Sequence, residues 1–126
     1  MKILTIDDDQ DTREIIKLTL GCIDDCTVFE AAGGLTGVDI AKREQVDIIL
    51  LDLIMPDFDG RQTFELLKSN NQTSTIPVIF ITTKGYFEGF DELKSKSSAY
   101  VDVILKPFDP MSLINEIQRV SNQIKI

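Results

Sequence analysis

The chain has 126 residues, 43% of them hydrophobic, which is enough for one domain with a sizeable core but short for two. Its 21 acidic side chains outnumber its 13 basic ones, and without any histidine the formal net charge is −8. This charge repels nucleic acid phosphates, and no basic run offsets it, so we expect no direct nucleic acid binding.

Strand and helix patterns alternate from the N-terminus onward. A short β-prone run at residues 3–6 ends in acidic residues, and a helical pattern follows over residues 11–20. The next pair is a strand at residues 26–30 and, after a glycine-containing turn, a helix over residues 35–43. The first third of the chain is therefore predicted to form two β-α units.

Residues 46–53 form the most apolar run of the chain, and its apolar residues are consecutive rather than alternating. This pattern is typical of a strand that is covered on both faces, so we predict that it is the central strand. A proline and a glycine follow it, and the next helix is predicted over residues 62–69. A fourth strand is predicted at residues 77–82.

The last third of the chain continues the alternation. A helix is predicted over residues 86–95, although two glycines weaken it, and a fifth strand at residues 101–105. Asp109 and Pro110 are typical of an N-cap and a first helical residue, and they open a last helix that runs to the end of the chain. Five β-α units indicate an α/β fold with a parallel sheet and helices on both faces. We expect a single domain over residues 1–126, with no output domain.

Polar side chains stand where the predicted strands end. Asp7 and Asp8 follow the first strand, Asp52 belongs to the end of the third, Thr82 ends the fourth, and Lys106 follows the fifth. The carboxyl ends of parallel strands line one crevice, so these five side chains are expected to converge. Carboxylates, a hydroxyl and an ammonium suit a hard divalent cation and a phosphoryl group, with one aspartate left as the nucleophile.

Four short motifs now carry a family resemblance. They are Ile-Asp-Asp-Asp at 6–9, Leu-Leu-Asp-Leu-Ile-Met-Pro-Asp-Phe-Asp-Gly at 50–60, Ile-Thr-Thr at 81–83 and Leu-Lys-Pro-Phe at 105–108. In this order they resemble the receiver domains of two-component response regulators, in particular the single-domain chemotaxis receivers. The resemblance implies a flavodoxin-like (βα)5 fold, a doubly wound parallel five-stranded sheet in the order 2-1-3-4-5.

The resemblance also implies a metal-assisted phosphoacceptor. Asp52 matches the aspartate that is phosphorylated, and Mg²⁺ would be held by Asp7, Asp8, Asp52 and the backbone carbonyl of Ile54, with Mn²⁺ or Ca²⁺ as substitutes in vitro. Mg²⁺ needs only a couple of carboxylates and keeps several waters, which fits this set. Without a cation, like charges so close together should raise the pKa of at least one carboxyl group.

Thr82 and Lys106 match the family residues that contact the phosphoryl group, and the resemblance implies a cis peptide between Lys106 and Pro107. The implied function is a two-component phosphorelay receiver, which is a phosphoprotein in signal transduction and not an enzyme with a separate substrate. The donor would be a sensor histidine kinase or a histidine phosphotransfer protein. A downstream protein would bind the surface of helix 4, strand 5 and helix 5, and a homodimer is allowed.

The sequence departs from the family pattern at three places. Val103 stands where many members have an aromatic residue that turns inward on activation. Thr83 stands where alanine or glycine is common, which should narrow access to phosphorus. Ile54 occupies a position that tunes hydrolysis, and because its apolar side chain cannot orient a water molecule, we expect a long-lived phosphorylated state.

Three alternative functions use parts of the same pattern. A magnesium-dependent aspartyl phosphatase would share the nucleophile, but the spacing of Asp7, Asp9 and Asp11 does not match its signature. The second alternative, a flavodoxin-like ligand-binding module, would need a phosphate loop without three aspartates. Asp7, Asp9 and Asp11 also imitate the start of a calcium loop, but that loop would need glycine where Thr12 stands. The third alternative is a receiver that binds partners without being phosphorylated. The presence of all five pocket residues argues against it.

Compartment signals are weak but consistent. The N-terminus becomes acidic too early for a signal peptide, and no apolar stretch approaches the roughly 20 residues of a membrane span. We therefore expect a cytoplasmic protein without membrane contact. Cys22 and Cys26 are the only cysteines, too few for zinc in a chain without histidine, and we expect reduced thiols, with a redox pair as the alternative.

Overall fold

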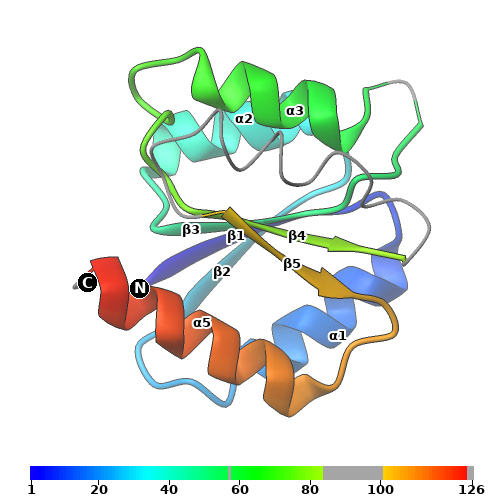
Figure 1. Cartoon of the computed structure of the whole chain (residues 1–126), viewed down its shortest axis with the longest axis vertical. Helices are drawn as coiled ribbons and strands as arrows, with labels where there is room; N and C mark the ends of the chain where they lie inside the picture. Colours follow the sequence, from blue (N-terminus) through cyan, green and yellow to red (C-terminus); the bar gives the residue numbers. More distant parts are fainter. Residues whose placement is uncertain (57, 84–100, 125–126) are drawn as a thin grey trace.

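The structure is a computed structural model that describes residues 1–56, 58–83 and 101–124. Its five strands are β1 (Lys2–Ile6), β2 (Thr27–Ala31), β3 (Ile48–Leu51), β4 (Val78–Thr82) and β5 (Val101–Leu105). They form one parallel sheet in the order β2-β1-β3-β4-β5, which confirms the expected order (Figure 1).

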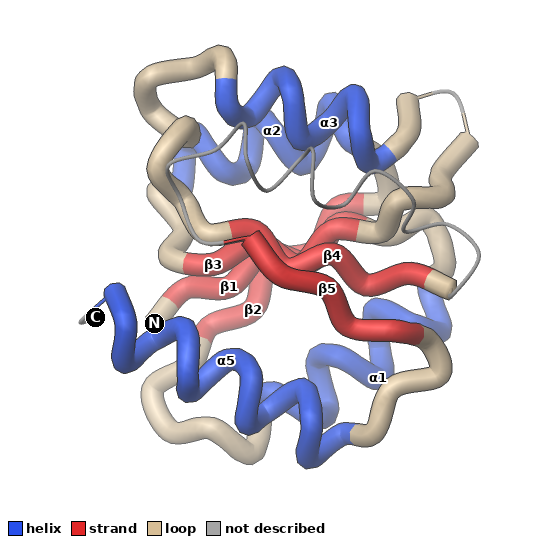
Figure 2. Tube along the Cα trace, viewed as in Figure 1, coloured by secondary structure: helices blue, strands red, loops and turns tan. Residues whose placement is uncertain are grey.

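Helices cover both faces of this sheet. The described helices are α1 (Gln10–Leu20), α2 (Gly34–Glu44), α3 (Gly60–Lys68) and α5 (Pro110–Ile124). α2 and α3 lie on one face, and α1 and α5 lie on the other (Figure 2). Two separate clusters of buried apolar side chains result, one under each helix pair, as a doubly wound sheet requires.

β3 is the middle strand, and all four of its residues are buried, which confirms the predicted central strand. The strand is shorter than the predicted range of residues 46–53. The reason lies in its neighbour, because β1 pairs with β3 only from Ile3 opposite Ile48 to Ile6 opposite Leu51. Val46 is buried although it lies outside the strand. Its apolar side chain therefore indicated burial in the core and not pairing within the sheet.

Aspartates start three of the helices. Asp9 caps α1 by accepting from the backbone N–H of Asp11, and Asp109 accepts from the backbone N–H of Ser112 at the start of α5, as predicted. α3 begins at Gly60 and not at Gln62, because Asp59 and Gln62 form a capping box that starts the helix two residues earlier than expected. Capping therefore moved this helix two residues closer to the end of β3.

The helix predicted over residues 86–95 lies outside the described residues. Among the helices that the structure does describe, none is long and apolar enough to cross a membrane.

Candidate functional site

The parallel register brings the predicted site residues to one edge of the sheet. Ile6 pairs with Leu51, and Leu51 pairs with Phe80, so the residues that follow β1 and β3 leave the sheet side by side. Thr82 pairs with Leu105 one residue before Lys106. The predicted convergence of residues that are up to 99 positions apart is therefore confirmed, as an ion pair between Lys106 and Asp7 also indicates.

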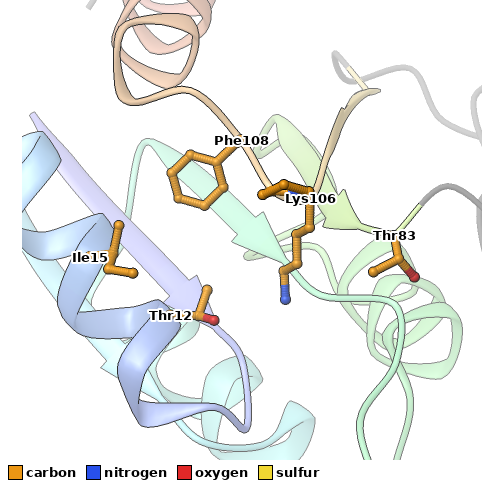
Figure 3. Close-up of a pocket in the computed structure, with 6 residues that line it drawn as sticks. Thr12, Ile15, Thr83, Lys106 and Phe108 are labelled. Atoms are coloured by element: carbon orange, nitrogen blue, oxygen red, sulfur yellow. The ribbon is translucent and has the colours of Figure 1, made fainter.

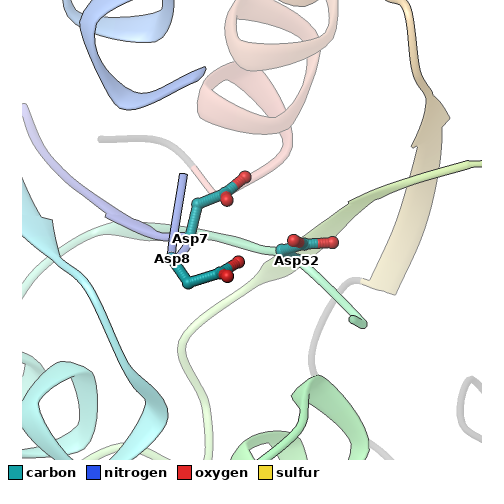
Figure 4. Close-up of side chains that lie close together, drawn as sticks. All are labelled: Asp7, Asp8 and Asp52. Atoms are coloured by element: carbon teal, nitrogen blue, oxygen red, sulfur yellow. The ribbon is translucent and has the colours of Figure 1, made fainter. Parts of the chain in front are cut away.

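Three carboxylates gather at this edge. Asp7, Asp8 and Asp52 each offer one oxygen, and these oxygens lie within 4.8 Å of one another (Figure 4). Asp7 and Asp52 are buried, with 2% and 6% of their surface exposed, whereas Asp8 is exposed to solvent. An all-oxygen set with one open side is the kind of site that Mg²⁺ prefers, so these residues could hold that ion.

Backbone groups fix the two buried carboxylates. Asp7 Oδ1 accepts from the backbone N–H of Asp9 at 2.9 Å, and Asp52 Oδ1 accepts from the backbone N–H of Ile54 at 3.2 Å. The second oxygen of each carboxylate remains for other partners. The role of the Ile54 carbonyl as a metal ligand stays a prediction.

Lys106 is the cation of the site. Its Nζ lies 3.0 Å from Asp7 Oδ2 and 3.5 Å from Asp52 Oδ2, and 22% of its side chain is exposed. The peptide between Lys106 and Pro107 is cis, as the resemblance implied, and the backbone N–H of Lys106 donates to the carbonyl of Thr82 at 2.7 Å. The side chain thus bridges two carboxylates from different strands.

Burial and like charge raise the pKa of Asp52 to about 6. Burial is the larger cause, the charge of Asp7 adds to it, and the ammonium of Lys106 opposes both. This confirms the predicted upward shift in the acidic group. Burial alone would lower the pKa of Lys106, but its hydrogen bonds and charge pairs with the two carboxylates hold that pKa above its ordinary value.

A cavity of about 240 Å³ opens beside Asp52 and is lined by Ile54, Thr82, Thr83 and Lys106. The hydroxyl of Thr82 is buried and has no hydrogen-bond partner among the described residues. A buried polar atom without a partner is costly unless a ligand or water satisfies it. The hydroxyl is therefore a candidate donor to a group bound in this cavity.

Gly60 lets α3 approach the back of the site. A Cβ at this position would collide with the carbonyl oxygen of Asp52, so no larger residue fits without a shift of the backbone. The N–H of Gly60 also donates to the carbonyl of Leu53 at 3.0 Å. The capped start of α3 thereby fixes the loop that follows Asp52.

Sequence reasoning missed Arg13. Its side chain is only 14% exposed, its Nη1 donates to the backbone carbonyl of Asp7 at 2.7 Å, and its Nε pairs with Glu30 at 3.2 Å. Lys17 pairs with the other oxygen of Glu30 at 3.1 Å. The sequence did offer a signal for this contact. Arg13 lies one turn into the helix that follows the acidic residues at 7–9, and Glu30 lies near the end of the next strand.

The structure also places three further residues that the sequence analysis named. Asp9 serves as a cap, and its pKa is lowered chiefly by the hydrogen bond from the Thr12 hydroxyl. Val103 is partly buried against the cluster beneath α2 and α3. Ile54 is 49% exposed at the mouth of the cavity. The hydrolysis rate that we expect from Ile54 stays a prediction.

Comparisons with known proteins place the chain in a family. The family model described as "Response regulator receiver domain" matches residues 3–118. Protein PilH of Pseudomonas aeruginosa is 36% identical over 93 residues, which are 74% of this chain and 75% of that protein. A chemotaxis protein CheY homolog of Campylobacter jejuni is 32% identical over 122 residues, which are 95% of this chain and 92% of its own.

Solved structures agree with these matches. The chemotaxis protein CheY4 of Vibrio cholerae superposes with a TM-score of 0.83 at 26% sequence identity, covering 94% of this chain and 97% of that one. Several other curated relatives are longer, and the chain spans between 42% and 50% of their length. The chain belongs to the family of response regulator receiver domains.

Proposed function

We propose that this receiver domain accepts a phosphoryl group on Asp52, from the phosphohistidine of a sensor histidine kinase or a histidine phosphotransfer protein. One observation carries the proposal. Asp52, Thr82 and Lys106 line one cavity of about 240 Å³, where Lys106 Nζ lies 3.5 Å from Asp52 Oδ2 and the Thr82 hydroxyl has no hydrogen-bond partner among the described residues. A nucleophile, a neutral donor and a cation around one space suit a phosphoryl group whose oxygens carry negative charge.

In the transfer, an Asp52 oxygen attacks phosphorus while the bond from phosphorus to the donor imidazole nitrogen breaks. The electron pair of that bond returns to the imidazole, and Asp52 becomes an acyl phosphate. Thr82 donates its hydroxyl hydrogen bond to a phosphoryl oxygen, and Lys106 exchanges its pairing with Asp52 for the same group. The cation and the neutral donor lie close to the nucleophile before the reaction, so both can reach the phosphoryl oxygens as negative charge develops on them.

The metal ligands in this proposal are Asp7, Asp8 and Asp52, with the carbonyl of Ile54 as a further oxygen. Bound Mg²⁺ would supply positive charge to the phosphoryl oxygens during transfer. The buried carboxylates supply the negative charge that selects a divalent cation, and the exposed Asp8 leaves a side open to water. In the metal-free protein, Lys106 partly compensates that charge.

Signalling then follows from the new contacts of Thr82 and Lys106. Each lies at the end of an edge or near-edge strand, so pulling them towards the phosphoryl group shifts the loops after β4 and β5. We propose that a downstream protein reads this change at the face formed by β5, α5 and the segment predicted as a helix over residues 86–95, which lies outside the described residues. Position 103 carries the small side chain of Val103, so the conformational change would involve the loops and not the rotation of an aromatic ring. We place this function in the cytoplasm, where the phosphohistidine donor and the downstream protein would both be accessible.

Intact-mass measurement after treatment with acetyl phosphate and Mg²⁺ tests the phosphoacceptor. The wild type should gain one phosphoryl group, and Asp52→Asn should gain none. Asp24→Asn, which removes an exposed carboxylate from a distant loop, is the matched control and should be loaded like the wild type. Equal loading of Asp52→Asn and wild type would overturn the assignment.

A further inference from the structure

A second cavity, of about 330 Å³, lies beside the phosphoacceptor site. It is formed between α1 and the segment that follows β5, and its lining residues are Thr12, Ile15, Thr83, Lys106, Pro107 and Phe108 (Figure 3). Its walls are chiefly apolar, with the ring of Phe108 and the side chain of Ile15 on the α1 side of Lys106.

The apolar wall is exposed to solvent where a helix would usually present polar residues. Ile15 has 50% of its surface exposed, although the next residue, Ile16, is completely buried in the core. Leu18 on the same helix is 74% exposed but does not line the cavity. Apolar surface that lines a concave space, unlike a single exposed apolar residue, indicates a ligand site.

The two cavities are neighbours and share part of their lining. Lys106 and Thr83 line both of them. The ammonium of Lys106 faces Asp52 and Asp7, while the alkyl stem of the same side chain borders the apolar cavity. A molecule with an anionic phosphoryl group and an apolar remainder therefore meets a cation at the boundary and apolar walls beyond it.

We infer that the apolar cavity is a subsite for the leaving group of a low-molecular-weight phosphoryl donor, of the class of aromatic acyl phosphates. The inference rests on the proposed function of Asp52. An Asp52 oxygen forms the new bond to phosphorus, the bond from phosphorus to the acyl oxygen breaks, and its electron pair leaves with the aromatic carboxylate. The ammonium of Lys106 faces the negative charge of both the donor and the departing carboxylate.

The size of the cavity fits this class. An apolar cavity of about 150 Å³ is known to hold a benzene ring, so 330 Å³ accommodates an aromatic acyl group with its carboxyl carbon. An acetyl group leaves most of the apolar wall uncovered. Contacts between the ring and the walls are formed on binding, so their main effect is expected on the apparent KM of the donor.

Phosphorylation rates with benzoyl phosphate and acetyl phosphate, both with Mg²⁺, test the subsite by intact mass. The ratio of kcat/KM for benzoyl over acetyl phosphate should fall about fivefold in Ile15→Ser, because an apolar wall is lost. Leu18→Ser, at a more exposed apolar position on the same helix that does not line the cavity, should leave the ratio unchanged. Comparing ratios between proteins cancels the intrinsic reactivity of the two donors.

A second measurement needs only the wild-type protein. Phenylphosphonate, which has no bond that can transfer its phosphorus, should inhibit labelling by acetyl phosphate at lower concentration than methylphosphonate does. Equal inhibition by both phosphonates would overturn the subsite. The same donor ratio in wild type, Ile15→Ser and Leu18→Ser would also overturn it, and the cavity would then be assigned to contacts with protein donors. If acetyl phosphate itself fails to label Asp52, the proposed function is at fault and not the subsite.

Discussion

Two half-buried lysines of this domain have opposite surroundings. Lys106 lies between the carboxylates of Asp7 and Asp52, and its pKa is above the ordinary value. Lys68, in α3, donates to the backbone carbonyls of Ser74 at 3.2 Å and Ile76 at 2.7 Å, and lies 5.4 Å from the centre of the Phe64 ring. Burial lowers the pKa of Lys68 to about 8.

The difference shows that burial alone does not decide the state of a lysine. Carbonyl dipoles and an aromatic ring carry no net charge, so around Lys68 the cost of burying an ammonium prevails. Two carboxylates carry full charges, so around Lys106 their attraction outweighs the same cost. Lys68 holds the loop between α3 and β4 through its two carbonyl contacts. Lys106 neutralises part of the negative charge of carboxylates that could also bind a metal ion.

The largest expected effect comes from Lys106→Met. Removing the ammonium leaves Asp7 and Asp52 facing each other without compensation, so the metal-free protein should lose about 3 kcal/mol of unfolding free energy at pH 7. Mg²⁺ no longer competes with the lysine, and its affinity should rise about tenfold. Chemical denaturation and calorimetric titration with Mg²⁺ measure the two quantities.

One further variant and one contrary outcome bound this result. Asp8→Ala should abolish the rise in melting temperature that we expect Mg²⁺ to cause in the wild type, because it removes a proposed metal ligand without touching Lys106. Unchanged Mg²⁺ affinity in Lys106→Met would mean that the lysine and the ion do not share the carboxylates.

Asp52→Asn tests the other half of the ion pair. Because the folded pKa of Asp52 is about 6 against an ordinary 3.8, the ionised carboxylate costs stability, and the variant should be about 2 kcal/mol more stable than metal-free wild type at pH 7. The folded state binds more protons than the unfolded state between pH 3.8 and about 6, so this cost shrinks as the pH falls through that window.

Denaturation of both proteins at pH 7 and pH 4 checks this sign. The advantage of Asp52→Asn should be nearly lost at pH 4, and Asp24→Asn, which removes an exposed carboxylate, provides the baseline at both pH values. An advantage that grew on acidification would contradict the raised pKa.

Lys68→Met should have the smallest effect and complete the comparison. The carbonyls of Ser74 and Ile76 lose a donor, so we expect a loss of about 1 kcal/mol of unfolding free energy. The Mg²⁺-induced rise in melting temperature should equal that of the wild type, since no carboxylate of the site is involved. A changed Mg²⁺ response would show that the two lysines are coupled.

Much of this fold could be predicted because it depends on local patterns. The unbroken apolar run around Ile49 indicated a strand covered on both faces, and Asp109 before Pro110 indicated a helix start. The ends of β3 and the start of α3 were misplaced, because pairing with β1 and the capping box of Asp59 decide them. Both depend on partners that a single run of sequence does not display.

For the site, the sequence by itself determined which side chains meet. A parallel sheet brings the residues after its strands to one edge, so Asp7, Asp52 and Lys106 had to converge once the β-α alternation was recognised. Only the tertiary structure decided that Lys106 bridges both carboxylates, that Arg13 holds the Asp7 carbonyl, and that Ile15 lines a second cavity. These details depend on side-chain directions and distances between separate elements, which periodicity and spacing along one chain do not specify.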